Sequence, residues 1–384
     1  MVPVQYNLRS LFVRKVTTFA TAFGIALVVF VFAAALMLGE GINRALATAG
    51  RPDNVIIMRK GSDAELASAI QNDYIGLFRG PSQVSQAAGV IGEIVIVITA
   101  ERSDGSGVSN VLVRGTPPDG IAFRPEIKIT SGRAPKPGTN EVIVGKAIAG
   151  RFKGIAMNDG FELRRNRPLQ VVGEFSSDGS SYESEVWGDL DVIRRSLGRE
   201  AVVSSVRARL NSPADFDAYR SLIENDKRFS MKVQREADYY EKQSQQTSGF
   251  LKGMGLAVAI LFSLAAMLGA AITMNGAVAH RSREIGTLRA LGFSRFSILT
   301  SFLFEAITLS VIGGIVGTVF VMLLSLVSFP VMNFQTFSEI VISFHATPAV
   351  FVKSLIFSGV MGLIGGLFPA IRASRVSPIE AMRA

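Results

Sequence analysis

The chain has 384 residues and no cysteine; 48% of its residues are hydrophobic and only 18% are charged. Its mean hydropathy of +0.35 is high for a water-soluble protein. The lack of cysteine excludes disulfides, CxxC redox chemistry and cysteine-ligated zinc. A net charge of +9 would suggest nucleic-acid binding, but residues 39–249 hold 28 basic and 27 acidic residues, a net of +1. The remaining positive charge flanks apolar segments, which favours a membrane protein that does not bind nucleic acid.

Four apolar segments are each long enough to cross a lipid bilayer, which takes about 20 residues in a helix. They are Thr17–Leu38, Gly253–Asn275, Phe296–Val327 and Ala349–Ala370. The first follows basic residues, as a secretory signal peptide would, but its uncharged stretch exceeds the about 7 to 15 residues of a signal core. We therefore predict an uncleaved membrane helix there and three more near the other end of the chain.

The short connections predict the orientation of these helices, because cytoplasmic loops carry an excess of Lys and Arg. Three basic residues precede the first segment, four lie in 280–295 and three follow Ala370, whereas 328–348 has none. Both termini are thus predicted to be cytoplasmic. The predicted parts are a cytoplasmic arm with the first span (1–38), an external domain (39–249), the second span (250–279), a cytoplasmic loop (280–295), the third span (296–327), an external loop (328–348), the fourth span (349–370) and a cytoplasmic tail (371–384).

The external segment alternates short runs of Val and Ile with Asp-Gly turns, a pattern typical of an α+β domain. Six runs predict strands: Asn54–Met58, Glu93–Thr99, Asn110–Arg114, Glu141–Val144, Leu169–Phe175 and Val202–Leu210. A helix is predicted from Ser212, which can cap it with Pro213 at the first position, and a second over Ala64–Gln71. Residues 231–249 are polar. They form either a solvated linker or, with 39–49, a helical stalk that continues two spans.

Catalytic and nucleotide-binding motifs are missing from the sequence. The Gly145-Lys146 pair lacks the other residues of a phosphate-binding loop, and neither HExxH nor GxSxG occurs. His280 and His345 are predicted on opposite sides of the membrane, so they do not form a metal site within one chain. We expect a chain without catalytic residues, bound metal or cofactor of its own.

Glu305 lies about ten residues into the third apolar segment, where a charge is costly and points to function. It either faces the helix bundle and bonds across helices, or reaches the cytoplasmic interface. Small residues also recur four positions apart, which lets helices approach closely in lipid. These pairs are Ala265 and Gly269, Gly313 and Gly317, and Gly362 and Gly366.

The cytoplasmic loop AHRSREIGTLRALGFSR predicts a short helix that Gly292 ends. On such a helix Ile285 and Leu288 share a side with Gly292, while Arg281 and Arg289 project from neighbouring positions. An apolar stripe flanked by charges suits insertion into a groove of a partner protein. An amphipathic helix lying on anionic lipid is the alternative.

At this loop the sequence resembles the MacB/FtsX-like ABC permeases, the type VII or mechanotransmission group. The family's R-x-R-E-I-x-x-L-R-x-L-G pattern corresponds to Arg281, Arg283, Glu284, Ile285, Leu288, Arg289, Leu291 and Gly292. Its glutamate and paired glycines in the third span correspond to Glu305, Gly313, Gly314 and Gly317. Its C-terminal pattern corresponds to Pro369, Ala370, Ala373, Pro378, Glu380, Ala381 and Arg383. The order of spans and the large insert also match, so the resemblance covers the whole chain.

The resemblance implies a permease of the bacterial inner membrane that moves a substrate such as a lipoprotein, peptide, toxin or drug. MacB carries a fused ATPase before its first span. This chain, in contrast, starts almost at its first apolar segment, so a separate ATPase subunit is expected. That subunit would hold ATP and Mg and would bind this chain through residues 281–292 and the tail. The resemblance also implies a dimer with a second copy or paralogue. Within the external domain, the two ends of the segment would form a porter-like subdomain and its middle, near 111–189, a second lobe. An adaptor protein and an outer-membrane duct are further candidate partners.

Two other function classes remain open at this point. An FtsX-like regulator would activate cell-wall hydrolases through its external domain and transport nothing. A membrane enzyme is disfavoured because the sequence shows no nucleophile, base or metal cluster in a recognisable pattern.

Overall fold

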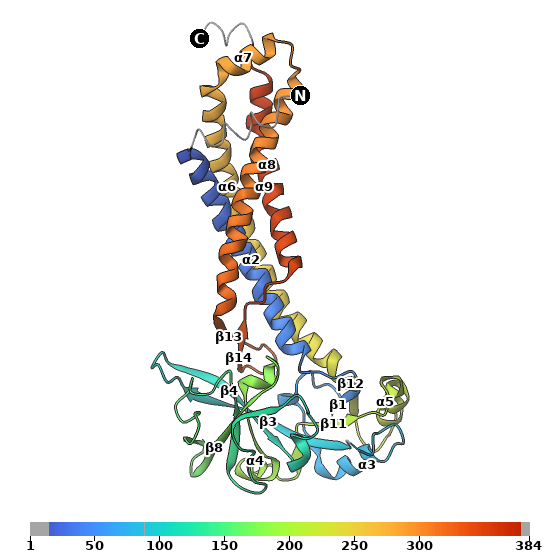
Figure 1. Ribbon diagram of the computed structural model, residues 1–384. Helices are drawn as coiled ribbons and strands as arrows, with labels where there is room; N and C mark the ends of the chain where they lie inside the picture. Colours follow the sequence, from blue (N-terminus) through green and yellow to red (C-terminus); the bar gives the residue numbers. More distant parts are fainter. Residues whose placement is uncertain (1–14, 88, 378–384) are drawn as a thin grey trace. The chain divides into compact units, whose positions relative to one another are not determined.

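The computed structural model describes residues 15–87 and 89–377, and these form two compact units (Figure 1). The helical unit holds the chain up to Glu40, residues 250–327 and the residues from 343 on. The sheet unit holds residues 41–249 together with 328–342.

Long apolar helices make up the helical unit. It contains α7 (Ser282–Ala290), α8 (Arg295–Met322), the 3-10 turn η6 (Leu323–Leu326) and α9 (Pro348–Ser374). It also contains α2 (Lys15–Ala47) up to Glu40 and α6 (Glu236–His280) from Phe250 on, while the rest of these two helices belongs to the sheet unit. Four of them, α2, α6, α8 with η6, and α9, are long and apolar enough to cross a membrane by length and composition. Each contains one predicted apolar segment, except that η6 ends one residue before Val327. Side chains of Ser294 and Thr347 cap α8 and α9 by accepting from Ser297 N and Val350 N.

Glycines of α8 and α9 allow helices of this unit to pack closely. A Cβ on Gly313 would lie 2.7 Å from Ala22 O of α2, and Gly317 faces Ala26 O of the same helix. Gly314 faces Ser358 of α9, while Gly362 and Gly366 of α9 face Ala306 of α8. The predicted close approach therefore holds for both glycine pairs. The third predicted pair differs, because nothing lies within 4 Å of the Cβ position of Gly269.

The sheet unit is an α+β domain around a ten-stranded sheet in the order β12-β1-β11-β3-β4-β9-β6-β8-β5, with β7 paired to β8 (Figure 1). Its strands are β1 (Asn54–Arg59), β3 (Val90–Glu101), β4 (Val108–Thr116), β5 (Lys128–Gly132), β6 (Glu141–Gly145), β7 (Gly160–Arg164), β8 (Arg167–Ser176), β9 (Glu185–Asp189), β11 (Ser205–Arg209) and β12 (Met231–Arg235). Two small sheets pair β2 (Ile70–Gln71) with β10 (Val202–Val203) and β13 (Ser328–Met332) with β14 (Glu339–Ser343).

Short helices complete this unit. They are η1 (Glu65–Ala67), η2 (Asn72–Tyr74), α3 (Ile75–Arg79), η3 (Pro118–Gly120), η4 (Ser181–Ser184), α4 (Leu190–Ser196), η5 (Pro213–Asp215) and α5 (Phe216–Glu224). The helix predicted from Ser212 is confirmed: Ser212 and Asp215 form a capping box ahead of α5. Apolar side chains of strands and helices share one buried core that includes Val55, Phe78, Val113, Val186 and Ile223.

All six predicted strands are present, but the last is split. Val202–Val203 pairs with β2, whereas β11 pairs with β1 and β3, and Ser204 between them bonds to Val95. The helix predicted over Ala64–Gln71 is wrong, because Ile70 and Gln71 pair with β10. Strands β5, β7, β9 and β12 and helix α4 were not predicted.

The two outer ends of α2 and α6 continue past their apolar segments, as the helical-stalk alternative predicts. Helix α2 runs to Ala47 and α6 begins at Glu236. Within the sheet unit Asn43 Oδ1 of α2 accepts from Ser248 Oγ of α6 at 3.0 Å and from Ser244 Oγ. The prediction fails for residues 231–235, which form β12 beside β1.

Candidate functional site

Helix α7, between α6 and α8, is the segment in which the sequence places the coupling site. Its backbone stops at Gly292, whose φ of +96° lies in the left-handed region that favours glycine. Phe293 N donates to Leu288 O at 3.2 Å, and Arg289 Nη1 donates to Phe293 O at 3.0 Å. The first bond satisfies a carbonyl in the last turn of this nine-residue helix, and the second ties its last turn to the residue that follows Gly292.

Arg281, at the start of α7, joins this helix to α8 through Glu305. Its Nη1 lies 3.1 Å from Glu305 Oε2 and its Nε lies 3.2 Å from Glu284 Oε2. The guanidinium also lies over the Phe302 ring, 5.2 Å from the centroid. The two paired side chains are only 8% and 14% exposed. Glu305 therefore bonds to a residue at the start of α7, a contact that fits both readings of this carboxylate.

One face of α7 packs against the chain's own helices. Ile285 is 2% exposed and lies in a cluster with Val278 of α6, Ile298 and Phe302 of α8, and Ala370 and Ala373 of α9. Leu288 and Phe293 pack against the same cluster. This corrects the prediction that the Ile285 and Leu288 stripe enters a partner's groove: it holds α7 to its own bundle, and Arg281 does the same.

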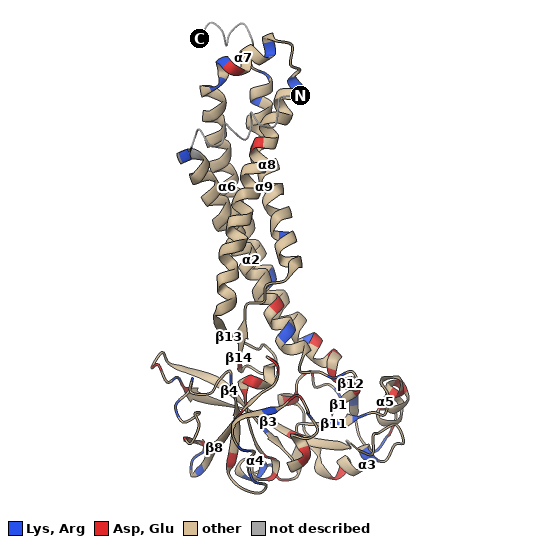
Figure 2. Ribbon diagram, in the orientation of Figure 1, with Lys and Arg blue, Asp and Glu red and all other residues tan. Residues whose placement is uncertain are grey.

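The opposite face of α7 is exposed and mixes charge with an apolar side chain. It presents Arg283, Glu284, Thr287 and Leu291, the last being 74% exposed. Figure 2 shows charged residues on α7, while α8 and α9 carry few charges along their lengths. A leucine held in water beside charged groups at the end of a fixed helix suits docking of a protein partner.

Most of the other predicted site residues are buried within the helical unit. Gly313, Gly314, Gly317, Gly362 and Gly366 are buried at the helix contacts described above, and Pro369 is buried inside α9. Val376, beyond α9, packs against the cluster that holds Ile285. The predicted tail residues Pro378, Glu380 and Arg383 lie outside the described residues.

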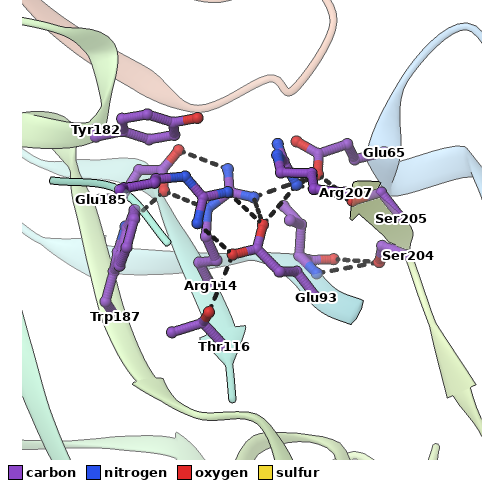
Figure 3. Close-up of polar contacts among 12 residues, drawn as sticks. Glu65, Glu93, Arg114, Thr116, Tyr182, Glu185, Trp187, Ser204, Ser205 and Arg207 are labelled. Atoms are coloured by element: carbon purple, nitrogen blue, oxygen red, sulfur yellow. Dashed lines mark hydrogen bonds and ion pairs between the residues drawn. The ribbon is translucent and has the colours of Figure 1, made fainter. Parts of the chain in front are cut away.

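A buried ionic network in the sheet unit was not predicted from the sequence (Figure 3). Its charged members are Glu65, Glu93, Arg114, Arg124, Glu185, Arg207 and Glu236. Arg114 donates two bonds to Glu185, at 2.7 and 2.9 Å. Arg124 donates two to Glu93, both at 2.8 Å. Arg207 bonds to Glu93 and Glu65 together, so the charges form one connected set.

The network reaches the first turn of α6. Arg207 Nε lies 2.8 Å from Glu236 Oε1, and Asn54 Nδ2 donates to Glu236 Oε2 at 2.8 Å. Tyr240 OH, one turn further, lies 2.9 Å from Tyr182 OH. Because Asn54 belongs to β1 and Arg207 to β11, these bonds fix the start of α6 to two neighbouring strands.

Opposite charges keep the carboxylates of Glu65 and Glu93 ionised. Burial opposes ionisation of Glu65, but Arg207 and Arg114 hold the pKa of its carboxyl at about 2. Burial also opposes ionisation of Glu93, whose three arginine partners nevertheless hold its pKa well below the usual range. Burial raises the pKa of Tyr182 to about 12. Closely paired ions and a neutral tyrosine are suited to positioning the strands and helices that carry them.

The sheet unit should therefore lose stability in acid. Because folding lowers the pKa of Glu65 from 4.5 to about 2, its contribution is complete above pH 5 and disappears as the pH falls toward 2. The loss from this residue is on the order of 3 kcal/mol. Urea unfolding of the full chain, followed by fluorescence of Trp187, the sole tryptophan, should show a lower midpoint at pH 3 than at pH 6.

Matched variants assign that loss. Glu65→Gln should reduce the difference between the midpoints at pH 3 and pH 6, with Glu93 supplying part of the remainder, whereas Glu162→Gln on exposed β7 should leave it unchanged. Equal midpoints at pH 3 and pH 6 in the unaltered chain would contradict the pKa shifts.

No metal site accompanies these groups. Within residues 15–87 and 89–377, no three His, Asp or Glu side chains are grouped so that they could hold a metal ion.

Two protein families match the chain. The MacB-like periplasmic core domain matches residues 18–226, and the FtsX-like permease C-terminal domain matches residues 256–378. Together they include α7, Glu305 and most of the sheet unit.

Individual relatives are similar to the chain over different lengths. The macrolide export ATP-binding/permease protein MacB of Chlorobium luteolum is 26% identical over 418 aligned positions, covering 99% of this chain and 60% of that protein. The uncharacterized ABC transporter permease YvrN of Bacillus subtilis is 42% identical over 106 residues, 28% of this chain and 24% of the relative. The chain thus spans less than two thirds of the length of these curated relatives.

A solved structure is also similar to part of the chain. The periplasmic region of MacB from Actinobacillus actinomycetemcomitans aligns with a TM-score of 0.38 and 12% identity, covering 50% of this chain and 92% of that structure.

Proposed function

Because the chain belongs to the MacB/FtsX-like permeases, we propose that it is the membrane subunit of an ABC transporter, which turns ATP hydrolysis by a partner ATPase into movement of its sheet unit. Its 384 residues carry no phosphate-binding loop, so ATP and Mg would be held by that partner. The work is then done on an external substrate without a polar tunnel, since α8 and α9 carry few charges along their lengths.

The observation that carries this proposal is the build of α7. One face is locked to the chain's own bundle by Ile285 and by the Arg281–Glu305 pair. The other face exposes Glu284 and Leu291. A partner that binds the exposed face therefore moves α6 and α8 with it, because both adjoin α7 directly in the chain.

The proposed topology has α2, α6, α8 and α9 crossing the bacterial inner membrane with both termini in the cytoplasm. Support comes from their length and apolar composition and from the basic residues in the short connections. The sheet unit, inserted between α2 and α6, would then lie outside the cytoplasm. Because the chain has no cysteine, its fold there does not depend on disulfide formation.

The substrate class proposed is a lipoprotein, peptide, toxin or drug, and the working unit is a dimer with a second copy or paralogue. An adaptor and an outer-membrane duct are further proposed partners. The similarity of residues 256–378 to the FtsX-like C-terminal domain supports an alternative, in which the sheet unit activates a cell-wall hydrolase. Deleting the partner ATPase should cause a compound to accumulate in the first case and silence a hydrolase in the second.

Docking on α7 is tested with residues of its exposed face. The double variant Glu284→Lys and Leu291→Asp should reduce recovery of the ATPase with the chain by about tenfold or more, as loss of a buried anchor typically does. Co-purification in mild detergent measures it. Leu222→Asp, at an exposed leucine of α5, is the matched control and should keep the ATPase bound. Full recovery with the α7 double variant would contradict docking there.

Topology is tested by labelling single introduced cysteines, which meet no background because the chain has none. An impermeant maleimide should label Gly105→Cys, in the turn between β3 and β4, in intact spheroplasts. Thr287→Cys on α7 should react only after the membrane is permeabilised. The reverse pattern would place the sheet unit in the cytoplasm and overturn the proposed orientation.

A further inference from the structure

The hairpin β13–β14, which joins α8 to α9, is bonded to the end of another hairpin of the sheet unit. Glu339 Oε1 lies 3.2 Å from Arg151 Nη2, while its Oε2 pairs with Arg102 and accepts from Ser109 Oγ at 2.7 Å. Asn110 Nδ2 donates to Phe337 O at 2.8 Å. We call residues 99–110, the paired ends of β3 and β4 with their turn, the β3–β4 arm. Arg102, Ser109 and Asn110 all belong to it.

Glu339 is the central group of this contact. Its side chain is 4% exposed, and it is the sole charged residue in the sequence 328–343. The facing Arg102 and Arg151 side chains keep 21% and 30% of their surface exposed. Hydrogen bonds between a carboxylate and guanidinium groups are strong and directional because both partners are charged. Glu339 makes such bonds to two arginines at once. Val341 N adds a bond to Ser184 Oγ at 3.0 Å, so both the acid and the backbone hold the hairpin.

Helix α6 touches the hairpin and also the strands of the sheet unit. Asn333 Nδ2 in the turn of the hairpin donates to Gln243 Oε1 of α6 at 3.2 Å, and Gln335 Nε2 donates to Gln246 Oε1 at 2.9 Å. The first residue of α6, Glu236, bonds to Arg207 of β11 and Asn54 of β1. The long strand β3 pairs with β11 over its first residues, up to Glu93, and with β4 from Ile94 onward. The contacts of Glu339 and of Glu236 therefore lie at opposite ends of β3.

We propose that Glu339 is a positioning residue through which the β13–β14 hairpin drives the β3–β4 arm, as a second input beside the contact that Glu236 of α6 makes with β1 and β11. Ser328 follows η6 by two residues, and Pro348 follows Ser343 by five, so the hairpin must follow the ends of α8 and α9. Movement of α8 then reaches the arm, while movement of α6 reaches β1 and β11. This inference rests on the proposed function, in which a partner moves α7 and thereby both α6 and α8.

The two inputs are separated by hydrogen exchange on the full chain with its ATPase in lipid nanodiscs, with and without ATP. In the unaltered chain ATP should change amide exchange both in the β3–β4 arm and in β1 and β12. Glu339→Gln should lower the ATP-dependent change in the arm by about threefold or more and leave that of β1 and β12 intact. Glu339→Asp, which keeps the charge, should restore part of the response.

Glu141→Gln is the matched control, because Glu141 bonds both guanidinium ends of Arg133 but holds no part of the hairpin. It should keep both responses. An unchanged response of the arm in Glu339→Gln would overturn the inference, and so would equal loss at both ends. If Glu339→Gln destabilises the hairpin, Arg151→Gln, which removes one of the two arginines, must show the same selective loss in weaker form. No ATP response anywhere in the unaltered chain would instead refute the proposed function.

Discussion

Replacing Glu93 by leucine is expected to lower the stability of the sheet unit by about 3 to 5 kcal/mol, the cost of leaving buried charges without their partner. Three guanidiniums, those of Arg114, Arg124 and Arg207, bond to this one carboxylate. Since a domain is typically stable by only about 5 to 15 kcal/mol, the variant should unfold at much lower urea than the unaltered chain. Fluorescence of the buried Trp187 reports the transition.

A double replacement tests whether the loss comes from the unpaired arginines. Removing Arg124 together with Glu93, as Glu93→Leu with Arg124→Met, should recover part of the loss, because one uncompensated charge is gone. Glu101→Gln, on the same strand but exposed, should change the urea midpoint little. A Glu93→Leu chain as stable as the original would show that the network contributes nothing to the fold.

Arg281→Ala should abolish ATPase docking without altering the docking face. The substitution leaves Glu305 in the helix bundle without its 3.1 Å partner and frees the start of α7 from α8. We expect a cost of about 3 kcal/mol, as for other broken buried pairs. Recovery of the ATPase should fall about tenfold or more, because the binding surface is no longer held in one position. Co-purification and thermal unfolding in detergent measure the two effects.

A paired replacement distinguishes positioning from direct contact. Arg281→Met with Glu305→Leu removes both charges and should restore docking in large part, since the apolar pair can still pack against Phe302. Arg295→Ala, at an exposed arginine at the start of α8, controls for the loss of a positive charge. Full docking by Arg281→Ala alone would mean that α7 needs no anchor.

Periodicity and turn chemistry made much of the fold predictable. The apolar segments contain enough uncharged residues that helices were the expected outcome, and Ser212 with Pro213 marks the start of α5 through local bonds. The end of α7 at Gly292 was predictable for the same reason, because a left-handed residue favours glycine. These features depend on neighbours in the sequence.

Features that depend on distant partners were missed. Met231–Arg235 is polar and compatible with a helix, but it pairs with β1, which lies far away in the chain. The hairpin at 328–343 belongs to the sheet unit through Glu339, whose partners Arg102 and Arg151 precede it by almost 200 residues or more. Tertiary pairing overrides local preference in both cases.

The position of helix α7 was predicted from the sequence, but the orientation of its faces was not. The pattern from Arg281 to Gly292 locates α7, yet the sequence does not say which face of a short helix is buried. Ile285 lies inward because α8 and α9 supply Phe302 and Ala370 beside it. The buried network had one visible signal, Glu93 within a run of Val and Ile, whose meaning depends on arginines from other strands.

The central claim is that a push received by α7 reaches the sheet unit. Spin labels at Val108→Cys in the β3–β4 arm and Leu222→Cys on α5, both exposed positions, report movement within that unit. Labelled chain is diluted with unlabelled chain and its ATPase in nanodiscs, so that only distances within one chain are recorded. ATP should shift the distance distribution, and the Glu284→Lys and Leu291→Asp variant should not respond. Identical distributions with and without ATP, in a complex that binds ATP, would contradict the account.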